Sequence, residues 1–215
     1  MILAFDTSAA HCAAALLRGD EVLAARAEPM AKGQAERLMP LLEELLAGAG
    51  AGWRDLDAIA VGIGPGNFTG IRISVAAARG LALSLRIPAL GVGTLEALAL
   101  DLPRPVLAVT DARRGEVYVQ GFGAGAVEPR LMTAEALAAD LPQGLALVGD
   151  GAAVLQALRP DLREVPPALP FAAQALARIA AARLASGAPQ PRPAPMYLRS
   201  ADAAPASDPP PVLLP

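Results

Sequence analysis

The stretch GIGPGNFTGIR, residues 62–72, lies between an apolar run and a segment with helical periodicity. Residues 57–63 are predicted to form a short buried strand, and residues 69–86 are predicted to form a helix. Four glycines within nine positions allow backbone conformations with positive φ and a close approach to neighbouring groups. The stretch therefore predicts a strand, a tight loop and a helix in succession.

Two functions are compatible with such a loop. The free amides at the start of a helix, together with the helix dipole, attract phosphate or carboxylate groups. The simpler alternative is a tight connection from strand to helix. Glycine content alone favours the connection, because the stretch has neither the Lys-Ser/Thr ending of a phosphate loop nor the spacing of a dinucleotide-binding loop.

The opening of the chain predicts three short strands joined by tight turns, at residues 2–6, 12–18 and 21–27. The first strand ends in an acid and two hydroxyls. This group resembles the first phosphate loop of actin-like ATPases, and it also suits a simple Asx or Ser/Thr turn. Both interpretations stay open for ancestry, and the turn is favoured over present catalysis. If a nucleotide binds, the predicted binding residues are Asp6, Thr7, Ser8, Gly64, Gly66 and Asn67.

Two amphipathic helices are predicted in the first half, at residues 33–49 and 69–86. In the second, arginines recur every seven residues and apolar side chains flank them on both sides, which is more than one sheet face can bury. We therefore expect this helix to pack on its sheet and also against the first helix or a partner subunit. Pro40 indicates that the first helix either begins near Leu38 or is kinked. The predicted partner interface comprises Leu38, Leu42, Leu45, Ile73, Ala76, Leu83, Arg72 and Arg79.

The second half of the chain repeats the plan of the opening. Residues 106–113 and 115–121 again give an apolar strand, an acid, a turn and a second strand, which predicts a duplicated α/β unit. Thr94 and Thr133 are predicted to cap short helices, and a final helix is predicted at 171–186. The predicted domains are an N-terminal lobe at 1–102, a C-terminal lobe at 103–187 and a proline-rich tail at 188–215, mostly extended or disordered.

Composition narrows the classes of function. The chain has 215 residues, a net charge of −3, one cysteine, one histidine and 3% aromatic residues. With Cys12 and His11 alone, no intramolecular disulfide and no metal site are predicted. The negative charge and the scarcity of aromatics argue against extensive direct contact with nucleic acid. We also see no uncharged apolar stretch long enough for a membrane helix and no basic leader, so we expect a cytoplasmic protein.

Four motifs together resemble one family. They are the opening Asp-Thr-Ser, the loop GPGNFTGIR, the run DARRGEVY at 111–118 and the sequence PMYLR at 195–199. In this order they are similar to the signatures of the TsaB (YeaZ) family, with Asn67 where that family usually has serine. The resemblance implies a duplicated ribonuclease-H-like, actin-like (ASKHA) two-lobed fold.

The resemblance also implies a function in making threonylcarbamoyladenosine in tRNA. It implies a non-catalytic scaffold that binds and activates a TsaD-type transferase, in a complex with a TsaE-type ATPase, and that forms a homodimer when alone. Contact with tRNA would then be indirect, and any ATP or ADP would belong to the complex. The alternative is an actin-fold ATPase or a glycoprotease-like enzyme acting on its own. No Ser-His-Asp set can be drawn around the single His11.

Overall fold

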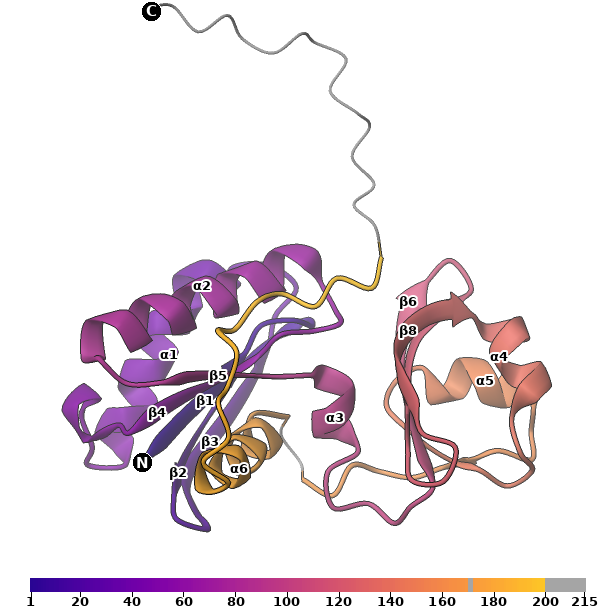
Figure 1. Ribbon diagram of the computed structural model, residues 1–215. Helices are drawn as coiled ribbons and strands as arrows, with labels where there is room; N and C mark the ends of the chain where they lie inside the picture. The colour runs from indigo at the N-terminus through magenta and orange to yellow at the C-terminus, as the bar shows by residue number, and fades with distance from the viewer. Residues whose placement is uncertain (170–171, 200–215) are drawn as a thin grey trace, which may run out of the picture.

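A computed structural model describes residues 1–169 and 172–199 and contains two five-stranded sheets (Figure 1). The first sheet has the order β3-β2-β1-β4-β5 and the second has the order β10-β9-β6-β7-β8. The strands of the first sheet are β1 (Ile2–Asp6), β2 (His11–Arg18), β3 (Glu21–Pro29), β4 (Ala58–Gly62) and β5 (Ala89–Val92). Those of the second are β6 (Val106–Arg113), β7 (Glu116–Phe122), β8 (Val127–Thr133), β9 (Ala146–Val148) and β10 (Arg163–Glu164).

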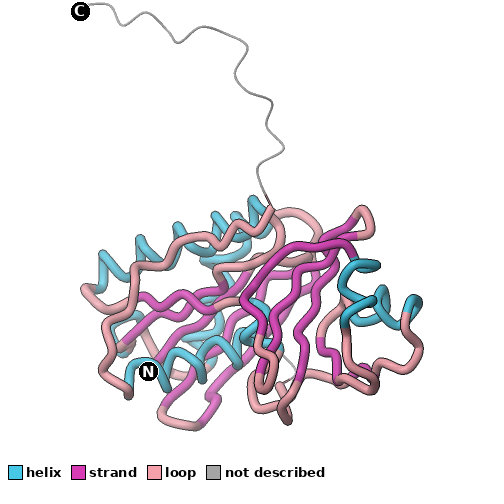
Figure 2. The backbone as a smooth tube through the Cα atoms, turned by 45° about the vertical axis from the view of Figure 1, so that its right-hand side comes forward, coloured by secondary structure: helices cyan, strands magenta, loops and turns pink. Residues whose placement is uncertain are grey.

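Helices connect and cover both sheets (Figure 2). They are α1 (Gln34–Gly48), α2 (Phe68–Leu85), α3 (Thr94–Leu98), α4 (Ala134–Asp140), α5 (Ala152–Leu158) and α6 (Ala172–Ala185), with one 3₁₀ turn, η1 (Trp53–Asp55). The helix after the glycine loop therefore begins at Phe68, one residue before its predicted start. Phe171, the predicted start of the last helix, lies outside the described residues.

The two sheets have the same topology. In the first, β1 is antiparallel to β2 and parallel to β4; in the second, β6 is antiparallel to β7 and parallel to β9. Helices follow the third, fourth and fifth strands of each sheet in the same order. The predicted duplication is confirmed, and the fold is the two-lobed α/β fold of the ribonuclease-H-like, actin-like class.

The last helix contradicts the predicted domain boundary. Residues 103–187 were assigned to the C-terminal lobe, but α6 packs on the first sheet, where Leu176 lies in a core cluster with Ala60 and Leu90. Figure 1 shows α6 against the strands of the first sheet. Small side chains on both sides explain the close packing, since α6 buries four alanines and the sheet presents more. The helix α3 lies between the lobes, with Ala97 in the core cluster of α6 and the first sheet and Leu95 in a cluster with Val106 of the second sheet.

The other face of the first sheet is covered by α1 and α2, and this corrects part of the predicted interface. Leu38, Leu42 and Leu45 are all under 5% exposed, in one core cluster with side chains of β1, β2, β4 and α2. They are buried because α1 packs across the sheet and also beside α2, so both flanks of its wide apolar surface are covered within the chain. These leucines are unavailable to a partner. The helix begins at Gln34, so Pro40 lies inside it, not in its first turn.

Two capping predictions have opposite outcomes. The hydroxyl of Thr133 accepts a hydrogen bond from the amide of Ala136 at 3.3 Å, as expected for an N-cap. Thr94 is instead the first residue of α3, the cap position is Gly93, and the Thr94 hydroxyl makes no hydrogen bond to the described residues. The prediction of Thr94 as a cap was therefore wrong by one position.

Candidate functional site

The glycine loop packs directly on the end of β1. A β-carbon on Gly70 would overlap the carbonyl oxygen of Thr7, and one on Gly66 would overlap that of Ser8. The amide of Asn67 donates a hydrogen bond to the Ser8 carbonyl at 2.6 Å. The glycines are therefore required by the close approach of two backbones. The structure brings the six residues predicted to bind a nucleotide into one region.

The polar groups of this region are largely used within the chain. Asn67 caps α2, because its side-chain oxygen accepts from the amide of Gly70 at 2.9 Å. The hydroxyl of Thr7 donates to the carbonyl of Gly70 at 2.7 Å. A phosphate at the start of α2 would have to displace the Asn67 cap. Nucleotide binding by these residues stays a prediction.

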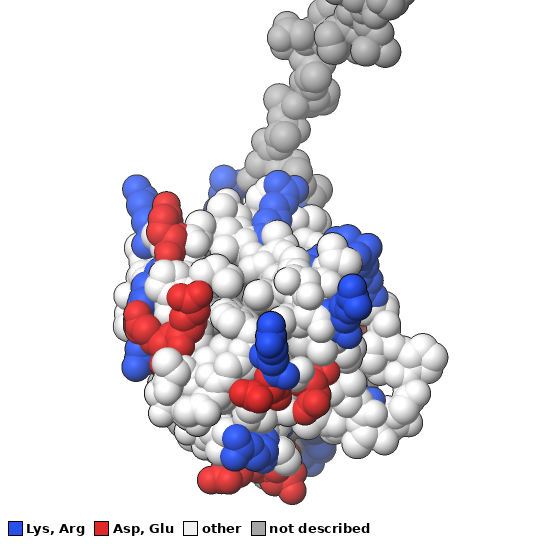
Figure 3. Space-filling view, turned by 90° about the vertical axis from the view of Figure 1, so that its left-hand side faces the viewer, with Lys and Arg blue, Asp and Glu red and all other residues white. Residues whose placement is uncertain are grey.

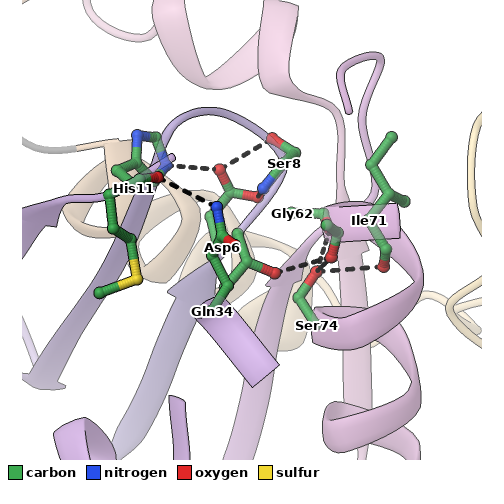
Figure 4. Close-up of polar contacts among 10 residues, drawn as sticks. Asp6, Ser8, His11, Gln34, Gly62, Ile71 and Ser74 are labelled. Carbon is green, nitrogen blue, oxygen red and sulfur yellow. Dashed lines mark hydrogen bonds and ion pairs between the residues drawn. The ribbon is translucent and has the colours of Figure 1, made fainter. Parts of the chain in front are cut away.

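Asp6 is the centre of a small buried network (Figure 4). Its carboxylate, 2% exposed, accepts hydrogen bonds from the hydroxyl of Ser8 at 2.9 Å and the amide of Ser8 at 3.1 Å, and it pairs with Nε2 of His11 at 2.9 Å. A β-carbon on Gly62 would overlap this carboxylate, so glycine at the end of β4 makes room for it. The hydrogen bond to Asp6 raises the pKa of His11, although burial opposes that effect.

This network differs from a nucleophilic triad. The Ser8 hydroxyl donates to the carboxylate, which lies between it and the imidazole in Figure 4. A serine nucleophile needs the imidazole beside its hydroxyl, with the carboxylate on the far side of the ring. Asp6, Ser8 and His11 are therefore arranged to hold the turn after β1 in place.

A polar cleft lies between the two lobes. It has a volume of about 460 Å³, and its lining includes Ser8, Asn67, Thr94, Thr110, Asp111, Arg113 and Asp150. The hydroxyls of Thr94 and Thr110 are buried and have no hydrogen-bond partner among the described residues. One arginine faces two aspartates, so the lining offers little positive charge for a phosphate. Within residues 1–169 and 172–199, no group of three or more His, Cys, Asp or Glu side chains could hold a metal ion.

The outer face of α2 is a candidate surface for a partner. Leu83 is 74% exposed and Phe68 is 43% exposed, and Arg72, Ala76 and Arg79 are exposed between them. Of the predicted interface residues on this helix, only Ile73 is partly buried. A helix this apolar normally buries most of its length, yet five of its eighteen residues are buried here.

The same helix meets the length and composition of a membrane span, with a mean hydropathy of 1.2. Its buried residues, which include Ile71 and Val75, pack on the first sheet. One helix of this kind is weak evidence for a membrane, since a helix that packs in a soluble domain passes the same test.

Charge is distributed unevenly between α1 and α2. Between Asp57 and Glu96 the sequence has no acidic residue, whereas α1 contains Glu36, Glu43 and Glu44. On the face in Figure 3, several blue and red side chains lie next to one another, and uncharged surface separates these mixed groups. The α2 face is thus apolar with arginines, whereas α1 carries glutamates, of which Glu44 pairs with Arg26 and Arg37.

Sequence reasoning missed two aromatic residues beside this face. Phe68 and Tyr197 stack with ring centroids 4.9 Å apart, and Arg72 donates from Nε to the Tyr197 hydroxyl at 2.7 Å. The signal that could have identified them is scarcity. The chain has four Phe, two Tyr and one Trp, and these two lie within the loop motif and the PMYLR motif.

Comparison with known families gives one matching model. Residues 27–140 match the family described as TsaD, tRNA N6-adenosine threonylcarbamoyltransferase.

Individual relatives extend the match over nearly the whole chain. The chain is 40% identical over 122 residues to the tRNA threonylcarbamoyladenosine biosynthesis protein TsaB of Escherichia coli K12, covering 54% of this chain and 52% of that protein. It is 38% identical over 209 residues to an uncharacterised protein of Mycobacterium tuberculosis H37Rv, covering 95% and 94% of the two chains. The chain spans about half the length of the curated TsaB relatives it matches.

A solved structure is similar to this chain over nearly its whole length. An uncharacterised Pseudomonas aeruginosa protein with similarity to the peptidase YEAZ superposes with a TM-score of 0.75 at 31% identity, covering 92% of this chain and 99% of that chain.

Proposed function

Because this chain belongs to the TsaB (YeaZ) family, we propose that it takes part in the biosynthesis of threonylcarbamoyladenosine in tRNA as a non-catalytic subunit that binds and activates a TsaD-type transferase. The observation that carries the proposal is the exposed apolar face of α2, centred on Leu83 and Phe68. A water-exposed apolar surface of this kind is typical of a protein interface. The face is narrower than predicted, since the leucines of α1 are buried within the chain.

The polar site supports a role other than catalysis. Ser8 and His11 both bond to the Asp6 carboxylate and hold a turn, and the cleft between the lobes offers one arginine against two aspartates. In the proposed complex the TsaD-type subunit supplies the catalytic groups and most of the tRNA contacts. A TsaE-type ATPase and ATP or ADP belong to that complex, and the chain alone forms a homodimer in the cytoplasm.

An enzyme acting alone is the weaker alternative. An ATPase would need its phosphate to replace the Asn67 cap, and a peptidase would need a serine beside the imidazole. Incubating the purified chain with ATP tests this alternative directly. Micromolar affinity with sustained turnover would favour the enzyme, and we expect neither.

The proposed interface can be tested with a charge placed on α2. Leu83→Glu should weaken binding to the TsaD-type protein of the same organism by roughly a hundredfold or more, because an unpaired carboxylate would be buried in the interface. Folding should be unaffected, since Leu83 is 74% exposed. Co-purification and biolayer interferometry measure the binding.

Leu158→Glu is the matched control. Leu158 is 43% exposed on α5, in the other lobe, and this variant should bind like the wild-type chain. Equal binding by both variants, or equal loss in both, would contradict the assignment of the interface to α2.

A further inference from the structure

The segment after α6, residues 188–199, crosses from the first lobe to the second, and we call it the strap (Figures 1 and 2). It passes β5 and then follows α2. The amide of Met196 donates to the carbonyl of Ile63 at 2.8 Å, and Pro193 is buried beside Gly91. A proline-rich segment without helix or strand is thus held at defined points on the first lobe.

Tyr197 joins the strap to the exposed face of α2. Its ring packs on Phe68, its hydroxyl accepts from Nε of Arg72, and the Arg72 guanidinium lies 3.7 Å from the centre of the Phe68 ring. Although they cover one another, Phe68 and Tyr197 remain 43% and 44% exposed. Aromatic rings and arginine at a partly open site are the residue types that contribute most to binding energy in protein interfaces.

The strap also borders the other end of this face. A hollow of about 220 Å³ lies between the second half of α2 and the strap, lined by Arg79, Leu83, Ile87, Arg192, Pro193 and neighbouring alanines. The surface of α2 and the surface of the strap are therefore continuous from Phe68 to Leu83.

All charged side chains of this combined surface are positive. Arg72, Arg79, Arg86 and Arg192 form no ion pair with any described residue. No acidic residue occurs at positions 58–95 or 186–199. A partner segment that fits here is apolar at its centre and acidic at its margin.

The next residues of the strap bind the second lobe. Arg199 donates to the carbonyl of Ala112 at 2.8 Å and pairs with Glu116 at 2.7 Å, and Leu198 packs in the core cluster of that lobe. Tyr197 is therefore held between two fixed points, Met196 on the first lobe and Arg199 on the second. Such preorganisation lowers the entropy cost of placing an aromatic side chain in an interface.

From these contacts we infer that the strap completes the docking surface on α2, with Tyr197 as its main contact, and that this surface receives an apolar segment of a protein partner flanked by carboxylates. The inference rests on the proposed function, because the TsaD-type subunit is the partner it assigns. A protein fits better than RNA, since the centre of the surface is Leu83 with the stacked Phe68 and Tyr197, and the four arginines lie around it.

The test compares three variants of Tyr197 in the full chain, with the TsaD-type protein of the same organism as the probe in biolayer interferometry. Tyr197→Ala should weaken binding by about tenfold or more. Tyr197→Phe keeps the ring and should stay within about threefold of wild type. Tyr197→Glu keeps a partner for Arg72 but places a carboxylate toward acidic groups, so it should bind more weakly than Tyr197→Ala.

Controls distinguish a failure of the inference about Tyr197 from a failure of the proposed function. Circular dichroism and thermal unfolding check that each variant is folded, and Leu158→Ala should bind like wild type. Binding that is lost in Leu83→Glu but unchanged in Tyr197→Ala would overturn this inference and leave the proposed function standing. A wild-type chain that does not bind the TsaD-type protein would overturn the proposed function and the inference with it.

Other occupants would be recognised by their own assays. If Tyr197→Ala leaves binding to the TsaD-type protein unchanged but weakens self-association in sedimentation equilibrium, the occupant is a second copy. If it weakens only the binding of unmodified tRNA, the occupant is RNA. Either result would overturn the inference. The inference would be supported if Tyr197→Ala loses binding to the TsaD-type protein and if binding of the wild-type chain weakens as the salt concentration rises.

Discussion

The two lobes follow the same strand order, but their helices differ greatly in length. In the first lobe the helices after the third and fourth strands, α1 and α2, have 15 and 18 residues; in the second, the equivalent α4 and α5 have seven each. The short helices α4 and α5 extend only over the second sheet. The long α2 covers its sheet with one side and leaves the other to solvent, so the same topology leaves a long exposed helix face on the first lobe.

The turns after the first strand of each lobe differ in the same way. In the first lobe, Asp6, Thr7 and Ser8 are buried and bonded to one another or to the glycine loop. In the second, the turn is exposed, and Arg113 and Arg114 have φ angles of 63° and 55°. What the lobes share is the backbone crossing: glycines after the fourth strand pack on the end of the first strand in both.

The largest expected loss of stability comes from adding a side chain to a glycine at this contact between two backbones. Gly70→Ala should prevent folding or cost more than about 4 kcal/mol, because the new β-carbon would overlap the Thr7 carbonyl and neither backbone can move away. Gly149→Ala should be as severe in the second lobe, where the overlap is with the Val109 carbonyl and φ is +110°. Urea unfolding measures both.

Gly80→Ala is the control for Gly70→Ala in the same helix. A β-carbon on Gly80 meets nothing within 4 Å, so this change should stabilise the chain by about 0.5–1 kcal/mol through helix propensity. If Gly70→Ala were as stable as Gly80→Ala, the crossing would not be the tight contact that both lobes share.

An intermediate loss of stability is expected from a change in α6. This helix follows the second lobe in the sequence but packs on the first lobe in the structure. Leu176→Ala should cost about 2–4 kcal/mol, because Leu176 is 1% exposed between α6 and the first sheet. Hydrogen exchange should accelerate in β1, β2 and β4 more than in β6 and β7. The opposite order would show that α6 belongs energetically with the second lobe.

The smallest expected effect is pH dependence from the turn of the first lobe. The pKa of His11 is raised in the folded chain by Asp6, so the pairing stabilises the fold fully below the usual histidine pKa of about 6.5 and loses its contribution as pH rises through the folded pKa. Relative to His11→Gln, which does not titrate, the wild-type free energy of unfolding should fall as the solution is made alkaline from pH 6. Parallel curves for the two proteins would contradict a stabilising Asp6–His11 pair.

Local patterns predicted the elements well. The strand, glycine loop and helix at residues 57–86 were placed within one or two residues, because apolar periodicity and glycine act over a few positions. The three opening strands and the duplication were also read from short patterns. The burial of Cys12 followed from its position in an apolar strand, and burial raises the pKa of its thiol to about 11.

The packing of elements that are far apart in the sequence could not be predicted from local patterns. The wide apolar surfaces of α1 and α2 looked alike in the sequence, yet α1 is covered by α2 and the sheet whereas much of α2 is open. The tail at 188–215 was predicted to be mostly extended or disordered, whereas residues 188–199 are held against both lobes by contacts far along the chain. The last 16 residues of the predicted tail lie outside the described residues.

The sequence by itself determined the strand and helix patterns, the duplicated plan and the family signatures, because these depend on residue type and short spacing. Only the tertiary structure decided that α6 joins the first lobe, that three predicted interface leucines are core residues, and that Tyr197 lies on Phe68 and Arg72. The physical reason is distance along the chain. Arg72 and Tyr197 are 125 positions apart, and their hydrogen bond exists only because the folded lobes bring the strap alongside α2.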